Sequence, residues 1–178
     1  MRPVRRRAQA VVEAHVLYIV STIVFFVIVL LFVNWFFNRS NVGSTNQMLH
    51  LIASRVADVT SKVYSVGLQI DLPGHPTTPI LVARQFFELP RSVGQSSYRV
   101  YYIVEGEVPV VVAQVGHSGD MIARYQMTKL AIAGADFTAS FHGEIAGGFP
   151  RYSVSCYISY LSAAGTWVKN LTLVLETV

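Results

Sequence analysis

The chain has 178 residues, and its 14 Lys and Arg against 10 Asp and Glu give a formal net charge of +4. Four of these cations, all arginines, lie in residues 1–8, which contain no acid, so the rest of the chain has 14 − 4 = 10 basic and 10 acidic residues. The charge therefore does not indicate nucleic-acid binding, which needs a basic patch on the folded domain. The single cysteine, Cys156, excludes an intramolecular disulfide framework.

The basic leader, residues 1–8, runs directly into an apolar segment. No charged residue occurs between residues 14 and 37. Roughly 20 apolar residues span a bilayer, whereas the apolar core of a secretory signal has only about 7–15. Segment 9–37 is therefore predicted to be a transmembrane helix, with Asn34–Phe37 as an aromatic anchor at the outer interface. The arginines before it predict a cytoplasmic N-terminus, which places the rest of the chain outside the cell.

The junction between leader and helix combines three arginines, a small residue, a glutamine and an acid: Arg5, Arg6, Arg7, Ala8, Gln9 and Glu13. This pattern resembles the class III signal peptide of archaeal type IV pilin-like proteins. The resemblance implies that a prepilin peptidase cuts between Ala8 and Gln9, which makes Glu13 the fifth residue of the mature chain. The sequence departs from the family at Ala8, where Gly is common, and at Val11 and Ala14, where this subtype often has Ser and Tyr.

Glu13 needs a physical explanation, because a carboxylate within a hydrocarbon span costs about 2.5–3.5 kcal/mol at mid-helix on insertion scales. The resemblance implies that Glu13 of one subunit pairs with the free α-amine of Gln9 of a neighbouring subunit in a filament. The alternative is a carboxylate that is stabilised by the helix dipole near the N-terminus and hydrated among the headgroups.

A polar link is predicted at residues 38–47, where Gly43 and several Asn, Ser and Thr side chains compete with helix. An amphipathic helix is then predicted at 48–67, ending near Gly67. Its apolar residues recur at steps of three and four: Met48, Leu51, Ile52, Val56, Val59, Val63 and Val66. Type IV pilins, which the chain resembles, lay the second half of such a helix across a β domain.

Residues 68–178 have the pattern of short strands separated by turns. The predicted strands are 68–72, 80–89, 98–104, 108–115, 126–133, 137–145, 152–160 and 168–178. This density is typical of a single antiparallel β domain. The predicted fold class is therefore α+β: one long N-terminal membrane and amphipathic helix, followed by an all-β antiparallel sandwich of the Ig-like kind. Leu89-Pro90 followed by Tyr98-Arg-Val-Tyr also resembles a passage of archaeal pilin-like domains.

No catalytic or metal site is expected. Cys156 alternates with Val154 and Ile158 on one strand face, which favours a buried core thiol over a nucleophile. The histidines of the β domain have no second ligand at metal spacing: His75, His117 and His142. Glu105 and Glu107 are interpreted as a solvated rim. We therefore expect no enzyme and no cofactor.

Two Asn-x-Ser/Thr sequons, at Asn38 and Asn170, lie on the predicted outer side. Such sites can carry glycans on surface filaments, although two matches in a chain of this length also arise by chance. Asn38 is the less favourable of the two, because it lies close to the membrane.

Two functional hypotheses remain open. The first is a subunit of an extracellular pilus-like filament, used in adhesion or assembly, whose partners are the membrane, the prepilin peptidase and copies of itself or other pilins. The second is an uncleaved single-span anchor whose β domain binds a partner, for example in the surface layer, similar to the stator subunits of the archaellum. Nucleic acid is not an expected partner of either.

Overall fold

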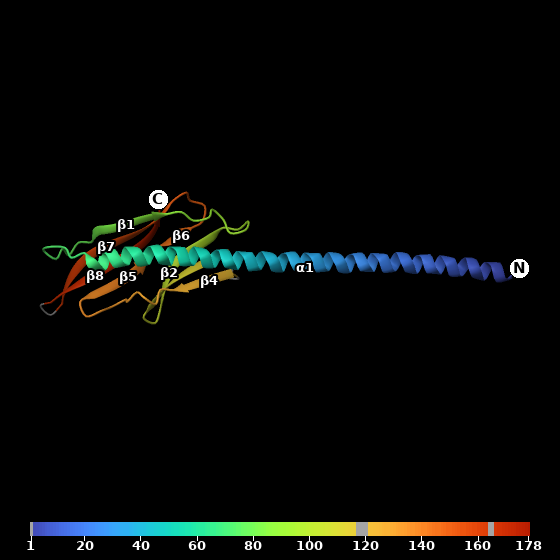
Figure 1. Ribbon diagram of the computed structural model, residues 1–178, viewed down its shortest axis with the longest axis horizontal. Coiled ribbons are helices and arrows are strands. Elements are labelled where there is room, and N and C mark those ends of the chain that lie inside the picture. Colours follow the sequence, from blue (N-terminus) through green and yellow to red (C-terminus); the bar gives the residue numbers. More distant parts are fainter. Residues whose placement is uncertain (1, 117–120, 164–165) are drawn as a thin grey trace. The chain divides into compact units, whose positions relative to one another are not determined.

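The structure, a computed structural model, describes residues 2–116, 121–163 and 166–178, and the side chains of these residues except 2–14, 38, 40, 41 and 163. Within them, the chain forms one helix followed by eight strands (Figure 1). The elements are α1 (Arg2–Gln69), β1 (Ile80–Phe87), β2 (Tyr98–Glu105), β3 (Val108–Val115), β4 (Met121–Gln126), β5 (Phe137–His142), β6 (Glu144–Ala146), β7 (Tyr152–Ala163) and β8 (Thr166–Thr177). The chain divides into two compact units, one ending at Gly43 and the other covering Ser44–Val178.

Helix α1 runs without interruption through residues 38–47, so the predicted polar link is wrong at the level of the backbone. Asn, Ser and Thr each cost only a few tenths of a kcal/mol more than good helix formers. Adding a residue to an existing helix gains a hydrogen bond, whereas a break would require a second, unfavourable nucleation. Continuation of the helix is therefore favoured between two strongly helical segments. The boundary between the two compact units still falls within this segment, after Gly43.

The second part of α1, residues 44–69, belongs to the same compact unit as the strands and buries one face in the β domain. The predicted apolar stripe is confirmed in its centre, but Met48, Leu51 and Val66 are exposed. The buried face consists of Leu49, Ile52, Ala53, Val56, Ala57, Val59, Thr60, Val63 and Tyr64. This face includes the small or polar residues Ala53, Ala57 and Thr60, which a search for large apolar side chains does not find. The buried face is therefore rotated about the helix axis relative to the predicted apolar stripe.

Two four-stranded sheets form the β domain, in the orders β1-β7-β8-β5 and β4-β3-β2-β6. All strand pairs are antiparallel except β5 with β8, which is parallel. The expectation of a purely antiparallel domain is therefore wrong for this pair. A parallel pair needs a long crossover connection, and the chain provides one because β6 and β7 lie between β5 and β8.

Most predicted strands are found, and β3 has the predicted bounds. Three predictions are wrong. Residues 68–72 contain the end of α1 and no strand, and the strand predicted at 126–133 lies earlier, at β4. The segment 137–145 is divided into β5 and β6 at Gly143, whose φ of +107° is unfavourable for other residues.

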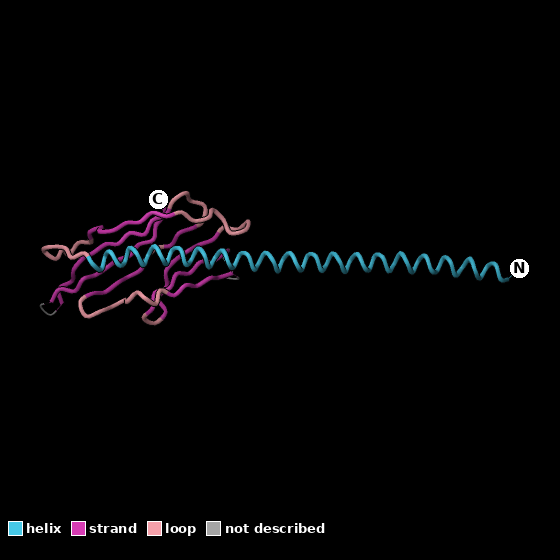
Figure 2. The backbone as a smooth tube through the Cα atoms, in the orientation of Figure 1, coloured by secondary structure: helices cyan, strands magenta, loops and turns pink. Residues whose placement is uncertain are grey.

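The core of the β domain contains residues of α1 and of both sheets. Figure 2 shows the C-terminal part of the helix lying alongside the strands. Val154, Cys156 and Ile158 of β7 share the buried face, as predicted, and each is 0% exposed. Leu171, Leu173 and Leu175 of β8 are also buried. Because α1 contributes to the same core cluster as both sheets, its second part is a structural component of the domain.

Candidate functional site

The first part of α1 is long and apolar enough to cross a membrane. Every side chain from His15 to Phe37 is exposed in the structure, and the segment contains no Asp, Glu, Lys or Arg. At about 1.5 Å per residue, this segment is about 35 Å long, compared with about 30 Å for the hydrocarbon core of a bilayer. It therefore has an apolar surface on all sides, suited to lipid or to other helices.

The C-terminal end of this segment carries a cluster of aromatic rings. The ring centroids of Phe32 and Trp35 are 6.0 Å apart, and the guanidinium of Arg39 lies 5.3 Å from the centroid of Trp35. Aromatic rings next to a cation are typical of the membrane–water interface. The spacing of four residues between Trp35 and Arg39 is the sequence signal for this contact, which the sequence analysis missed.

The predicted processing and assembly residues lie in the helical backbone at the start of α1. The structure does not describe the side chains of these residues, which are Arg5, Arg6, Arg7, Ala8, Gln9 and Glu13. The backbone alone shows that Gln9 and Glu13, four residues apart, lie on the same face of the helix. A cut between Ala8 and Gln9 would therefore leave the new α-amine and Glu13 about one turn apart.

Two tyrosines attach the second part of α1 to the β domain through hydrogen bonds. The hydroxyls of Thr60 and Tyr102 lie 2.6 Å apart, and the hydroxyl of Tyr64 donates to the carbonyl of Ala131 at 3.0 Å. Burial raises the pKa of both tyrosines, Tyr64 and Tyr102, so their hydroxyls stay protonated in neutral solution.

The C-terminal end of α1 is held by a buried cation. The ammonium of Lys169 on β8 donates to the carbonyl oxygens of Leu68 (2.9 Å) and Ile70 (2.5 Å) and to Oδ1 of Asp71 (3.1 Å). Its side chain is only 8% exposed. A cation at this end of a helix is favoured by the helix dipole and satisfies terminal carbonyls that lack helical partners.

Gly67 permits the closest approach of α1 to the sheet. A Cβ at this position would lie 2.5 Å from the Sγ of Cys156 and 2.9 Å from a methyl of Leu171. The predicted role of Gly67 as the helix terminator is therefore wrong, because α1 continues to Gln69. The glycine is needed for close packing.

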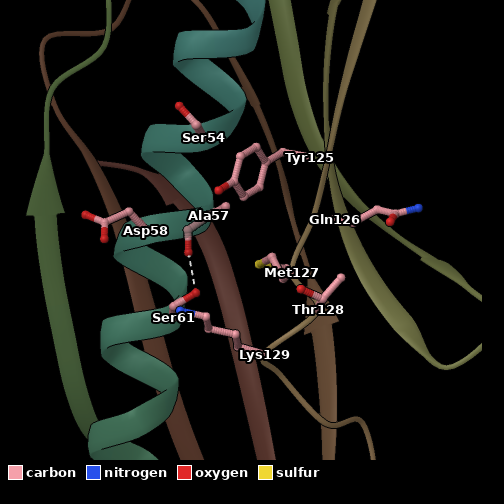
Figure 3. A pocket seen from close by; sticks show the side chains of 9 residues that line it. All are labelled: Ser54, Ala57, Asp58, Ser61, Tyr125, Gln126, Met127, Thr128 and Lys129. Carbon is pink, nitrogen blue, oxygen red and sulfur yellow. Dashed lines mark hydrogen bonds between the residues drawn. The ribbon is translucent and has the colours of Figure 1, made fainter.

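A groove of about 230 Å³ lies between α1 and the chain that follows β4 (Figure 3). Its wall includes Asp58, which pairs with Lys62 at 2.8 Å, and Ser61, whose hydroxyl donates to the carbonyl of Ala57 at 2.7 Å. Ser54 likewise donates to the carbonyl of Leu51. Both serine hydroxyls of the groove therefore bond carbonyls of their own helix.

The other candidate chemical groups of the sequence form no catalytic arrangement with one another among the described side chains. Cys156 is a free, buried thiol, and burial raises its pKa to about 11, so it is unreactive at neutral pH. Glu105 pairs with Arg124 at 2.8 Å on the surface. Among the side chains that the structure describes, no three of His, Cys, Asp or Glu gather as metal ligands. His117 lies outside the described residues.

The two sequons differ in what the structure describes. The Asn38 side chain is not among the described ones. Asn170 is half-buried in β8, and its Oδ1 accepts a hydrogen bond from Thr138 at 3.2 Å. It alternates with the buried residues Lys169 and Leu171, so it lies on the outer face of the sheet.

No family model, curated protein or solved structure matches this chain.

Proposed function

We propose that this chain is the structural subunit of an archaeal type IV pilus-like surface filament, used in adhesion or assembly. In this proposal, a prepilin peptidase removes the leader between Ala8 and Gln9, and the mature chain polymerises through its N-terminal hydrophobic helix. The β domain, in an Ig-like arrangement, lies outside the cell. The chain passes from the plasma membrane, with its N-terminus cytoplasmic, into the extracellular filament.

The observation that supports this proposal most strongly is the change of surface along one continuous helix. From His15 to Phe37, α1 exposes apolar side chains all round, and from Leu49 onward it forms part of the core of the β domain. Polymerisation through a helix requires that the helix be built into the domain that it carries. Thr60, Tyr64 and Gly67 provide such attachment through two hydrogen bonds and a close approach.

The leader supplies the second support. Arg5, Arg6 and Arg7 before the apolar helix favour retention of this end in the cytoplasm. A cut after Ala8 would remove these charges and leave the hydrophobic helix on the mature chain. Gln9 and Glu13 would then lie one helical turn apart, with a free amine and a carboxylate available to neighbouring subunits.

The alternative is an uncleaved single-span anchor with an extracytoplasmic β-sandwich that binds a partner, similar to archaellum stator subunits. The aromatic cluster at Phe32, Trp35 and Arg39 suits a helix that stays at a membrane interface. The two functions differ in processing, because only the filament subunit would lose its leader.

The role of Glu13 is tested with Glu13→Ala in the native host. We expect this variant to insert into the membrane normally but to enter sheared filaments at a strongly reduced level. Glu107→Ala, which removes an exposed carboxylate of the β domain, is the matched control and should be incorporated normally. Filaments of Glu13→Ala in normal amounts would contradict the assigned role.

A further inference from the structure

Three aromatic rings from distant parts of the sequence meet at one end of the β domain. His75 comes from the turn before β1, Tyr160 from β7 and Trp167 from β8. The rings of His75 and Trp167 are stacked, with centroids 5.4 Å apart and planes 7° apart. The edge of one ring meets the face of the other in the pair of His75 and Tyr160, at 4.9 Å. Trp167 remains 45% exposed, whereas Tyr160 is buried.

These rings line a cavity of about 290 Å³ that also contains Asp71 and Asp136. This volume is at the lower end of ligand pockets, which begin at roughly 300 Å³. It suits a ligand of about one six-membered ring with its substituents. The lining therefore combines an exposed indole with two aspartates and with Lys169, which pairs with Asp71.

The position of His75 is maintained against a conformational cost. Its φ is +47°, in the left-handed region that non-glycine residues rarely adopt, and it follows Gly74 with φ +80°. The backbone N–H of Tyr160 donates to the carbonyl of Pro76 at 2.8 Å, which fixes this turn against β7. Such strained positions persist only where the surrounding structure holds them, and they cluster at functional sites.

The charges of the cavity disfavour an anionic ligand. The ammonium of Lys169 already makes three hydrogen bonds, to two carbonyls and to Asp71. Asp71 is 87% exposed in its side chain, Asp136 is also exposed, and both residues line the cavity. A phosphate or an acidic sugar would be repelled by them, whereas hydroxyl groups could donate hydrogen bonds to them.

The arrangement of the rings also disfavours a quaternary ammonium ligand. Such a cation is bound best over the faces of several aromatic rings. Here His75 stacks on Trp167 and meets Tyr160 in an edge-to-face pair, so much of the ring surface is already used within the cluster. The exposed part of the Trp167 indole is instead suited to the C–H face of a pyranose, whose weakly positive hydrogens match the negative face of an aromatic ring.

We propose that the cavity formed by His75, Tyr160, Trp167, Asp71 and Asp136 binds a neutral hexopyranose. The indole of Trp167 contacts the apolar face of the sugar, and the carboxylates accept hydrogen bonds from its hydroxyls. This site belongs to the β domain alone and does not depend on polymerisation.

The test is titration of the full-length protein, in a detergent without sugar headgroups, with glucose, galactose, mannose and N-acetylglucosamine. Isothermal titration calorimetry is the main readout. The chain has two tryptophans, so a Trp35→Phe background leaves Trp167 as the single reporter of a fluorescence change. We expect saturable binding of at least one sugar, with a dissociation constant on the order of 1 mM, as befits a small ligand.

Substitutions test whether the sugar binds in this cavity. Trp167→Ala should weaken the affinity more than tenfold, and Asp136→Asn should weaken it severalfold. Phe149→Ala is the matched control, because Phe149 is a similarly exposed aromatic residue, at 47%, that does not line the cavity. Unchanged circular dichroism of Trp167→Ala would show that the domain is folded. Asp136→Asn, which keeps the aromatic cluster, preserves the test if Trp167→Ala does not fold.

Several results would overturn the proposal: no saturable response to any of the four sugars, equal binding by wild type and the cavity variants, or binding of choline without binding of sugar. Failure of the proposed filament function would be recognised separately. A chain that binds sugar but is never processed or incorporated into filaments would contradict the filament and support this site.

Discussion

The two parts of α1 belong to one unbroken helix, yet their environments differ. Residues 15–37 expose apolar side chains on every side, whereas residues 49–64 bury one face against two sheets. The first part therefore depends on surroundings outside the chain, such as lipid or neighbouring helices, to cover its surface. The second part obtains its stability from the β domain. Substitutions in the two parts should consequently affect different properties.

The largest effect on folding is expected from a charge placed on the buried face of the second part. Val56 is 0% exposed, so Val56→Asp should cost about 4–5 kcal/mol or more and unfold the β domain. Leu51→Asp, on the exposed side of the same helix segment, should change stability by only about 0.5 kcal/mol. Denaturant unfolding and protease resistance of the full chain measure both. Equal losses from the two variants would contradict the assigned faces.

Removal of the cation at the end of α1 should have the next largest effect. Lys169→Met would leave the carbonyls of Leu68 and Ile70 and the carboxylate of Asp71 without the ammonium that they contact. We expect a loss of about 2–3 kcal/mol in the free energy of unfolding, because the carbonyls lose a charged donor whereas Asp71, 87% exposed in its side chain, stays hydrated. Lys129→Met, at an exposed lysine, is the control and should be nearly neutral. A loss below about 1 kcal/mol for Lys169→Met would show that the cation is dispensable.

Two glycine substitutions in α1 should have smaller effects on stability, and of opposite sign. Gly67→Ala should destabilise the domain by about 1–3 kcal/mol, because its Cβ would collide with Cys156 and Leu171. Gly43→Ala has no atom within 4 Å to meet, and should stabilise α1 by up to about 1 kcal/mol. Adding Cys156→Ala to Gly67→Ala should recover part of the loss. A double-mutant cycle without coupling would contradict the packing.

The smallest effect is expected at the buried thiol. Cys156→Ala should be nearly neutral, whereas Cys156→Ser should be tolerated less well, because it places a hydroxyl in an apolar site. Since burial raises the thiol pKa from its usual value of 9.0 to about 11, the folded state holds this proton more tightly. The contribution of this proton to the free energy of unfolding is therefore fully present below pH 9. It is lost as the pH rises from 9 to about 11.

Alkylation of Cys156 by iodoacetamide at neutral pH provides a direct check. The thiol should react slowly in the native protein and rapidly after denaturation, because only the unfolded chain exposes it. Equal rates in the two states would contradict its burial. Loss of function in a folded Cys156→Ala variant would instead revive a role for the thiol as a nucleophile.

The features that the sequence predicts well are those repeated over many residues. The apolar run before residue 38 predicts the exposed first part of α1, and strict alternation predicts the buried face of β7 around Cys156. The link predicted at residues 38–47 fails, because local composition opposes helix only weakly whereas helix propagation favours it. A local pattern cannot measure that competition.

The contacts that the sequence could not predict join residues far apart in the chain. Lys169 reaches the end of α1 across about a hundred residues, and His75 stacks on Trp167 over a similar distance. Only the strand order brings these groups together. The sequence does contain one indication for Lys169. It alternates with Leu171 and Leu173 on one face of the predicted strand, which predicts that its side chain faces the core.

The most direct test of the proposed function is the intact mass of the native protein in membrane and sheared-filament fractions. Mass measurement is preferable to stepwise sequencing, because an N-terminal Gln9 can cyclise and block the reaction. The proposal predicts a mass that begins at Gln9 in the sheared fraction. A mass that begins at Met1, found only in membranes, would contradict it and identify the chain as an uncleaved anchor.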